Sequence, residues 1–273
     1  LWRTFPATLR SCLRSSPPNR LSVLVLPRHG RKGASSRLRA LDLLPGLAGR
    51  GIDTTVRPFF DDRYLDDLYA GRPASLTSLL RYSIRRLATL MRARAYDVVW
   101  IEKEALPFVP FPIEAAMLVG TRYIVDLSDA WFLRYQLHRR PLVRVLLGGK
   151  LSGLVRRARL TTVSSGYLES WVRSAGADAV VQLPTPIDLA LYRPRSEPRT
   201  GPFTVGWIGT PTTAVYLRPL AGVLADLIRS GGVEVHLVGA GEVEAALVRT
   251  ESDSSVHDWS LFCSELGRRF PLI

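Results

Sequence analysis

The sequence is poor in cysteine and has no long apolar stretch. Its 273 residues include two cysteines, Cys12 and Cys263, too few for a disulfide framework or a cysteine-ligated zinc site. This scarcity favours a reducing compartment, and we expect a cytoplasmic protein. No apolar run approaches the roughly 20 residues that a membrane-spanning helix needs. The longest candidate, Leu142–Val155, is interrupted by Arg144, Lys150 and three glycines, so the sequence predicts a protein that does not span a membrane.

Acidic residues are the scarcer charge. The chain has 37 Lys and Arg against 24 Asp and Glu, a net charge of +13, and an isoelectric point near 10.5. This excess favours an anionic partner, such as an acidic lipid surface or a phosphorylated ligand, over a basic surface that is merely solvated. We expect no nucleic-acid partner, because the basic stretches lack interleaved aromatics, a helix-turn-helix pattern and zinc-ligand spacing.

The ordered part of the sequence begins with a β-α-β pattern. Leu21–Leu26 (LSVLVL) is apolar throughout, as expected for a buried parallel strand. A loop follows, and Ser36 suits the N-cap of a helix that continues to Gly49. The strand Ile52–Arg57 completes the unit. This pattern predicts a Rossmann-like fold, whose ligands bind outside the carboxyl ends of the strands. The loop contains G-R-K-G where a dinucleotide oxidoreductase would have G-x-G-x-x-G.

Four further strands are predicted before residue 184, and they alternate with helices. They are Asp97–Glu102, Arg122–Val125, Leu160–Val163 and Ala179–Leu183. Residues 21–183 are therefore predicted to form a complete doubly wound α/β domain with a parallel sheet. Residues 1–20, rich in Arg and Ser, are predicted to be an unstructured leader.

Two long helices are expected between these strands. One spans Leu142–Ala158. The other begins at Leu76, with arginines (Arg81, Arg85 and Arg92) on a face that is solvated or lies against acidic lipid head groups. Its apolar face, which we expect to be core, consists of Leu76, Leu79, Leu80, Ile84, Leu87 and Met91.

A proline-rich segment, residues 184–202, predicts a hinge, because each proline removes a backbone donor and disfavours helix before it. Residues 203–250 then begin a second α/β domain, with strands Phe203–Ile208 and Val233–Val238 and a further helix from Glu242. Residues 251–273 are predicted to be an irregular tail. The turn that contains Gly209, Thr210 and Thr213 leads from a strand into a helix. The N-terminus of that helix can bind an anion, but the same sequence also fits an ordinary tight turn.

Several phrases in order resemble the landmarks of a known family. They are GASSRLRALDLLPGLAGRGID, YDVVWIEKEALP, YIVDLSDAW, LTTVSSGYLESWV, LPTPIDLALYRP and GWIGTPTTAVYLRPL. Together they resemble glycosyltransferases of the GT-B fold, in particular the retaining, nucleotide-sugar-dependent group similar to family 4. The resemblance covers Leu21 to Val248.

The resemblance implies an enzyme whose N-terminal domain binds the acceptor and whose C-terminal domain binds a nucleotide-sugar, with transfer in the cleft. The nucleotide-sugar is a substrate, and no metal or cofactor is implied. The acceptor is not identified, and the two alternatives are a lipid-linked molecule and a polysaccharide. A lipid-linked acceptor would involve peripheral contact with the inner face of the membrane. The implied acceptor-side residues are Gly30, Gly33, Ser35, Ser36, Arg37, Asp126 and Asp129. The implied donor-phosphate residues are Gly209, Thr210 and Thr213.

These assignments have a chemical reason, since backbone N–H groups and a guanidinium stabilise the charge of a leaving nucleoside diphosphate without a metal. For Asp126 and Asp129 a helix cap or loop brace is the alternative.

The sequence departs from the family in its last part. The family carries a glutamate pair on a late helix of the C-terminal domain. Glu234 and Glu242 have a similar spacing, but Glu234 lies on a predicted strand, so we interpret the match as chance. The catalytic residues stay unassigned, and we expect a truncated chain, whose own activity the sequence leaves open. The alternative is a non-catalytic module that binds an anionic acceptor or an acidic membrane surface.

Overall fold

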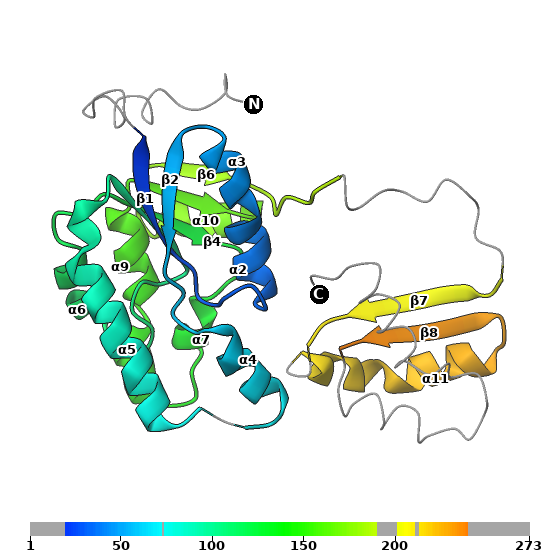
Figure 1. Ribbon diagram of the computed structural model, residues 1–273. Coiled ribbons are helices and arrows are strands. Elements are labelled where there is room, and N and C mark those ends of the chain that lie inside the picture. Colours follow the sequence, from blue (N-terminus) through cyan, green and yellow to red (C-terminus); the bar gives the residue numbers. More distant parts are fainter. Residues whose placement is uncertain (1–19, 73, 190–200, 211–212, 240–273) are drawn as a thin grey trace. The chain divides into compact units, whose positions relative to one another are not determined.

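The computed structural model describes residues 20–72, 74–189, 201–210 and 213–239 (Figure 1). The predicted leader, most of the predicted hinge, the helix predicted from Glu242 and the predicted tail lie outside these residues. The chain divides into two compact units. The first runs to Asp188, apart from the short segment Asp66–Arg72, which groups with the second unit; the second begins at Leu189. The division lies within the segment predicted as a hinge.

The first unit is built on a sheet of six strands in the order β2-β1-β3-β4-β5-β6. The strands are β1 (Leu21–Leu26), β2 (Ile52–Val56), β3 (Val98–Glu102), β4 (Tyr123–Leu127), β5 (Leu160–Val163) and β6 (Val180–Gln182). Every neighbouring pair is parallel. The predicted Rossmann-like α/β class and its six strands are confirmed.

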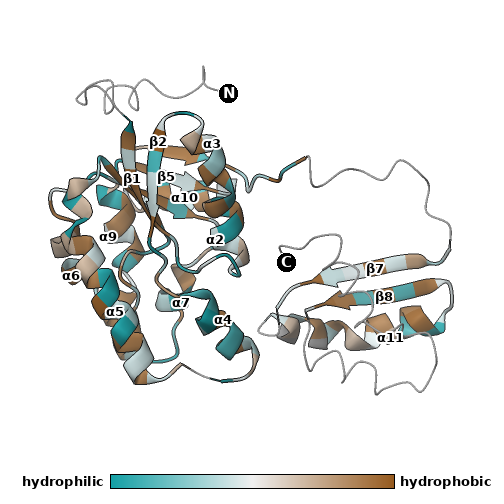
Figure 2. Ribbon diagram, in the orientation of Figure 1, coloured by the Kyte–Doolittle hydropathy of each residue, from teal (hydrophilic) through white to brown (hydrophobic). Residues whose placement is uncertain are grey.

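Helices cover both faces of this sheet (Figure 1). The helices between residues 20 and 189 are, in chain order, α2 (Ala34–Arg39), η2 (Leu41–Leu43), α3 (Leu44–Ala48), α4 (Asp62–Tyr69), α5 (Leu76–Met91), η3 (Ala93–Ala95), α6 (Phe111–Leu118), α7 (Leu133–Gln136), α8 (Pro141–Leu147), α9 (Lys150–Arg157) and α10 (Gly166–Ser174). Successive residues of β1 point to opposite faces. Val23 and Val25 pack with Ala40 after α2, whereas Leu24 and Leu26 belong to the main core. The apolar strands lie between the helical layers (Figure 2).

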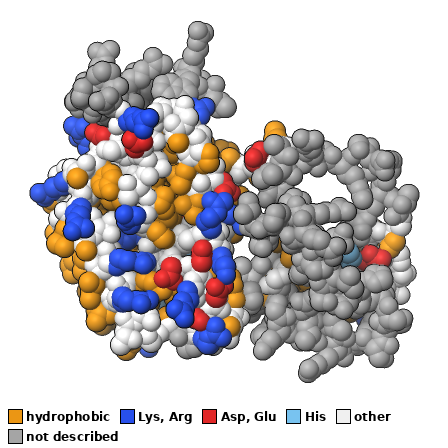
Figure 3. Space-filling view, viewed as in Figure 1, with side chains coloured by type: hydrophobic (Ala, Val, Ile, Leu, Met, Phe, Trp, Pro, Cys, Tyr) orange, Lys and Arg blue, Asp and Glu red, His pale blue; other side chains and the backbone are white. Residues whose placement is uncertain are grey.

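The predicted core face of α5 is correct only in part: Leu79 and Leu87 pack against buried clusters, but its other four residues are exposed. Leu76, Leu80, Ile84 and Met91 are 84%, 61%, 57% and 72% exposed. The buried residues of the helix are Tyr82, Arg86 and Leu90. These three recur every four residues, and Arg86 can serve as a core residue because its long aliphatic stem packs while Nη2 donates to the carbonyl of Pro27 at 3.2 Å. The prediction counted aliphatic residues and therefore chose the neighbouring face. Exposed apolar and basic side chains consequently lie side by side where α5 reaches the surface (Figure 3).

Two predicted helices are interrupted. The first begins at Ala34 with Gly33 as N-cap, so Ser36 lies inside the helix and is not its cap. It then breaks into α2, η2 and α3, since Pro45 lies in the first turn of α3 and cannot continue a helix from before it. The helix predicted over Leu142–Ala158 is two helices, α8 and α9, separated at Gly148 and Gly149.

The second unit contains a two-stranded parallel sheet of β7 (Phe203–Ile208) and β8 (Val233–Val238), as predicted. The helical segment between them starts as the 3-10 helix η4 (Ala214–Leu220), which contains Pro219, and continues as α11 (Ala221–Arg229). Ala214, Leu217 and Leu237 form its small core. None of the helices in the described ranges of either unit is long and apolar enough to cross a bilayer.

Candidate functional site

The carboxyl ends of β1 and β3 form the topological switch point of the first sheet. From β1 the chain proceeds outward to β2 and then returns to β3 on the other side of β1. Open α/β sheets bind ligands at such a point, because the loops diverge and leave a crevice. Two charged segments meet here: Arg28–His29 follows β1, and Glu102–Glu104 ends β3. The site described below is built on these two segments.

Glu102 holds the loop after β1 against β3. Its Oε2 accepts hydrogen bonds from the Arg28 backbone N–H at 2.9 Å and from Ser36 Oγ at 2.5 Å, and its Oε1 accepts one from Ser35 Oγ at 2.6 Å. Ser36 Oγ also accepts from the backbone N–H of His29 at 3.0 Å. Ser36 is buried, and Glu102 is 2% exposed. Both predicted serines thus fix the loop against the end of β3.

Close packing explains the two predicted glycines of this loop. A Cβ on Gly30 would lie 2.4 Å from Asp62 Oδ1, and a Cβ on Gly33 would lie 2.4 Å from the Cβ of His29. Asp62 Oδ1 also accepts the backbone N–H of Lys32 at 2.9 Å. Gly33 therefore requires glycine if the loop is to keep this course, whereas a side chain at position 30 would require the Asp62 carboxylate to move.

Asp126 lies at the end of β4, as predicted, but its carboxylate is occupied. Arg39 donates to both of its oxygens, through Nε to Oδ2 at 3.0 Å and through Nη2 to Oδ1, and Thr162 Oγ1 donates to Oδ1. Arg39 and Asp126 are each 2% exposed. Arg39 Nη1 also donates to the carbonyl of Leu183. This buried pair therefore ties α2 to β4 and to the chain that follows β6.

Asp129 is the more open of the two predicted aspartates. Its side chain is 50% exposed, and its Oδ2 lies 2.7 Å from Lys103 Nζ. Lys103 has a backbone φ of 65°, a left-handed conformation that is uncommon for a residue with a side chain. This conformation directly after β3 places a lysine beside the ring of Trp131, with Nζ 4.5 Å from its centroid. Non-glycine residues in such conformations cluster at functional sites.

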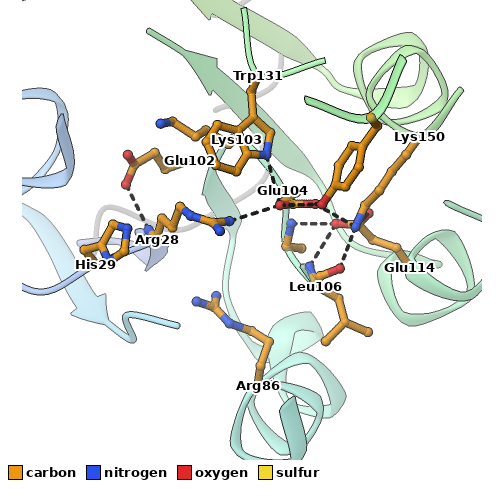
Figure 4. Close-up of polar contacts among 12 residues, drawn as sticks. Arg28, His29, Arg86, Glu102, Lys103, Glu104, Leu106, Glu114, Trp131 and Lys150 are labelled. Atoms are coloured by element: carbon orange, nitrogen blue, oxygen red, sulfur yellow. Dashed lines mark hydrogen bonds and ion pairs between the residues drawn. The ribbon is translucent and has the colours of Figure 1, made fainter. Parts of the chain in front are cut away.

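Glu104 is the centre of a buried network (Figure 4). Its Oε1 accepts from Arg28 Nη1 and from Trp131 Nε1, each at 3.0 Å, and its Oε2 accepts from the hydroxyl of Tyr135 at 2.8 Å. Lys150 Nζ lies 2.8 Å from the same Oε2.

A second carboxylate continues the network behind Lys150. Glu114 Oε2 lies 3.3 Å from Lys150 Nζ, and its Oε1 accepts the backbone N–H groups of Ala105 and Leu106. Lys150 thus lies between the two carboxylates, and Glu114 fixes the loop that follows β3 through two backbone N–H groups.

The electrostatics of this network are set by burial and by its cations. Burial opposes ionisation of Glu104, but Lys150 and Arg28 outweigh it and hold its pKa below the ordinary value. Glu114 is more deeply buried, and burial raises its pKa despite Lys150. Burial, with Arg28 and Lys103 nearby, lowers the pKa of His29 to about 3, so this imidazole is neutral at physiological pH. His29 lies against the rings of Phe60 and Tyr64.

Three cations surround the half-buried indole of Trp131. The guanidinium of Arg28 lies 4.3 Å from the ring centroid, Lys103 Nζ 4.5 Å and the guanidinium of Arg134 4.9 Å. Two of these cations have carboxylate partners, Glu104 and Asp129. An aromatic face and fixed positive charge at the switch point can contact the apolar face of a sugar ring and hold an anionic group beside it. We define these four residues, Arg28, Lys103, Trp131 and Arg134, as the tryptophan site.

The remaining predicted residue of the first unit, Arg37, lies on α2 with its side chain 21% exposed and its Nε 4.0 Å from Asp42 Oδ2. It is not among the residues of the tryptophan site. Within the ranges that the structure describes, no group of three or more His, Cys, Asp and Glu side chains could hold a metal ion.

In the second unit, Gly209, Thr210 and Thr213 lie in one turn at the carboxyl end of β7. Thr213 Oγ1 accepts the backbone N–H of Thr210 at 2.9 Å and donates to its carbonyl, and the Gly209 N–H donates to Val238. Gly239, with φ 74°, approaches so closely that a Cβ on it would lie 2.5 Å from the carbonyl oxygen of Gly209. The turn thus joins the carboxyl ends of β7 and β8.

The sequence prediction missed the tryptophan site. The available signal was the alternation Glu102-Lys103-Glu104 directly after a buried strand, which is unusual because charged residues are seldom buried without partners. Arg28 and Glu104 are 76 residues apart in the sequence. Only the fold shows that the two segments pair.

Comparisons with known proteins show likeness in fold. No protein-family model and no curated protein matches the chain. Among solved structures, it is similar to sucrose-phosphate synthase from Thermosynechococcus elongatus, with a TM-score of 0.54 and 13% identity over 93% of this chain and 68% of that one. At this identity the likeness shows the fold alone, the Rossmann-like α/β architecture of GT-B proteins.

Two further solved structures are less similar to the chain. One is a UDP-N-acetylglucosamine 2-epimerase, with a TM-score of 0.42 and 14% identity over 80% of this chain and 63% of that one. The other is Arabidopsis thaliana UGT89C1 in complex with UDP-L-rhamnose, with a TM-score of 0.41 and 13% identity over 80% of this chain and 65% of that one. The chain spans less than two thirds of each.

Proposed function

We propose that this protein is a glycosyltransferase of the GT-B fold, similar to the retaining family 4 group, which transfers a sugar from a nucleotide-sugar to an acceptor. The observation that carries the proposal is the tryptophan site, where three cations converge on one indole at the switch point of a Rossmann-like sheet. The fold, which is similar to that of a sucrose-phosphate synthase, is compatible with this proposal.

In this proposal the first unit binds the acceptor. The exposed part of the half-buried Trp131 would contact a sugar or another ring, and Lys103 and Arg134 beside it would attract an anionic group on the same molecule. The buried network of Glu104, Lys150 and Glu114 holds Arg28 and Trp131 in place before the substrate arrives. Such preorganisation lowers the ordering cost of binding.

The second unit binds the donor in this proposal. The turn of Gly209, Thr210 and Thr213 lies at the carboxyl end of β7, where Rossmann-like domains bind phosphates, and Gly239 itself lies close against Gly209. A nucleoside diphosphate would be the leaving group, and N–H donors with positive charge would stabilise it. No metal or cofactor is part of the proposal.

Nucleoside diphosphate release in the presence of a nucleotide-sugar panel and candidate acceptors, lipid-linked and polysaccharide, tests this function. We expect release that depends on one donor and one acceptor class and that Trp131→Ala reduces at least tenfold, while Trp171→Ala, a control for loss of an indole elsewhere, changes it less. Nucleotide-independent binding of the acceptor class without release from any donor would instead favour the non-catalytic anion-binding module.

A further inference from the structure

The surface formed by α7, residues 137–140 and α8 combines exposed apolar and basic side chains. We call it the α7–α8 surface. Its exposed aliphatic residues are Leu133, Leu137, Leu142, Val145 and Leu146. Its exposed basic residues are Arg134, Arg139, Arg140 and Arg144. Five aliphatic side chains in fourteen residues exceed what scattered surface positions explain, so this surface is a candidate for an interaction.

Negative charge is absent from this part of the chain. No Asp or Glu occurs between Asp129 and Glu169, whereas the same stretch contains eight Lys and Arg residues. Among the described residues, none of the four exposed arginines of the α7–α8 surface forms a salt bridge. Their charge is therefore available to an anionic partner.

The basic residues border a pocket of about 550 Å³. It is lined by Leu133, Arg134, Leu137, His138, Arg139 and Arg140. Internal hydrogen bonds fix its rim: Arg144 Nη1 donates to the carbonyls of His138 and Arg139 at 2.7 and 3.3 Å, and the Arg140 N–H donates to His138 Nδ1 at 3.1 Å. The pocket thus offers three guanidinium groups next to two leucines, which suits a phosphate that carries apolar chains.

We propose that the α7–α8 surface docks on an acidic lipid bilayer, with its aliphatic side chains in the interface and its arginines on lipid phosphates. An interfacial element needs both features, since apolar burial supplies affinity and cations select anionic lipid. Nucleic acid would engage the arginines but leave the aliphatic residues in water. A protein partner would favour an apolar centre depleted of charge, whereas here arginines alternate with the aliphatic residues along the chain.

Bilayer docking would place lipid beside the tryptophan site, because Arg134 belongs to both: it lines the pocket and lies 4.9 Å from the ring centroid of Trp131. An acceptor anchored in the membrane could then reach the tryptophan site without leaving the bilayer. This last step rests on the proposed function, whereas the docking itself does not.

The test is co-sedimentation of the full chain with vesicles of phosphatidylcholine alone or mixed with phosphatidylglycerol, without nucleotide. We expect binding to the acidic vesicles only. The triple variant Leu142→Ser, Val145→Ser, Leu146→Ser should weaken it at least tenfold. The double variant Arg139→Gln, Arg140→Gln should weaken it about thirtyfold, since each basic residue contributes about 1 kcal/mol at such a surface. The altered side chains are exposed, and a circular dichroism melt checks that each variant folds.

The control variant Leu220→Ser, Val223→Ser removes two exposed apolar side chains of the second unit and should bind acidic vesicles as the unaltered chain does. No binding to acidic vesicles, or unchanged binding by both α7–α8 variants, would overturn the proposal; the latter would assign the contact to another surface such as α5. Tight duplex DNA binding that the leucine substitutions leave unchanged, or a dimer that they abolish, would also overturn it. Because the assay contains no nucleotide-sugar, its outcome is independent of the transferase proposal.

Discussion

Lys150 shows how much one buried charge can support. It is 1% exposed, and its ammonium group lies between the carboxylates of Glu104 and Glu114. Replacing a buried ion pair as a whole costs little, but removing one partner leaves the others desolvated and unpaired.

We therefore expect Lys150→Met to lower the free energy of unfolding by about 3–5 kcal/mol, measured by urea denaturation at pH 7. Lys32→Met is the matched control, since the Lys32 side chain is exposed, and it should stay within about 0.5 kcal/mol. Equal effects of the two substitutions would show that the buried network does not support the fold.

His29 gives the first unit a dependence on pH. Its pKa is about 3 in the folded chain against an ordinary value of 6.5. Between these values the unfolded chain binds a proton that the folded chain does not, so stability falls as the pH falls from 6.5 towards 3.

His29→Gln should remove this part of the acid sensitivity. One pKa unit corresponds to 1.36 kcal/mol, so between pH 6.5 and 5 the unaltered chain should lose about 2 kcal/mol more than the variant. Urea unfolding at the two pH values measures the difference. Parallel losses in the two proteins would mean that His29 is accessible to protons in the folded chain.

At the scale of elements, α5 shows why a face can be misassigned. The face predicted from the sequence has more aliphatic residues than the buried face. The buried face consists of Tyr82, Arg86 and Leu90. Two leucines ten residues apart on one helix make a matched pair: Leu90 is 1% exposed and Leu80 is 61% exposed.

Leu90→Ala should cost about 2–5 kcal/mol of unfolding free energy, because it leaves a cavity in the main core. Leu80→Ala should change it by no more than about 0.5 kcal/mol. Chemical denaturation of both variants measures these losses. A larger loss for Leu80→Ala than for Leu90→Ala would show that the face predicted from the sequence is the buried one.

The strands were predictable because each is a short apolar run bounded by turn residues, a local signal. The six strands of the first sheet and both strands of the second followed from that signal alone. Pro45 and Gly148 are local signals for a helix break. The apolar residues on either side of each keep a helical spacing, which predicts one continuous helix where the structure has separate ones. The tryptophan site required contacts between Arg28, Glu104 and Trp131, which are separated by up to 103 residues, and the sequence has no local pattern for such pairing.

At the scale of the whole molecule, the two units have separate tasks in the proposed function. The first holds a charged aromatic site on a complete sheet, and the second holds a glycine-rich turn on two strands. The central claim is that the second unit binds the diphosphate of a nucleotide-sugar. Two glycines of that unit allow a controlled test. Gly239 adopts a positive φ against Gly209, whereas Gly222 in α11 has no atom within 4 Å of an added Cβ.

The most direct measurement is a thermal-shift titration of the full chain with nucleoside diphosphates and nucleotide-sugars. We predict selective stabilisation by one nucleotide, of about 2.7 kcal/mol at 100 times its dissociation constant, that Gly239→Ala abolishes and Gly222→Ala preserves. A cooperative melt that no nucleotide shifts, or a shift that Gly239→Ala leaves intact, would contradict donor binding at this turn.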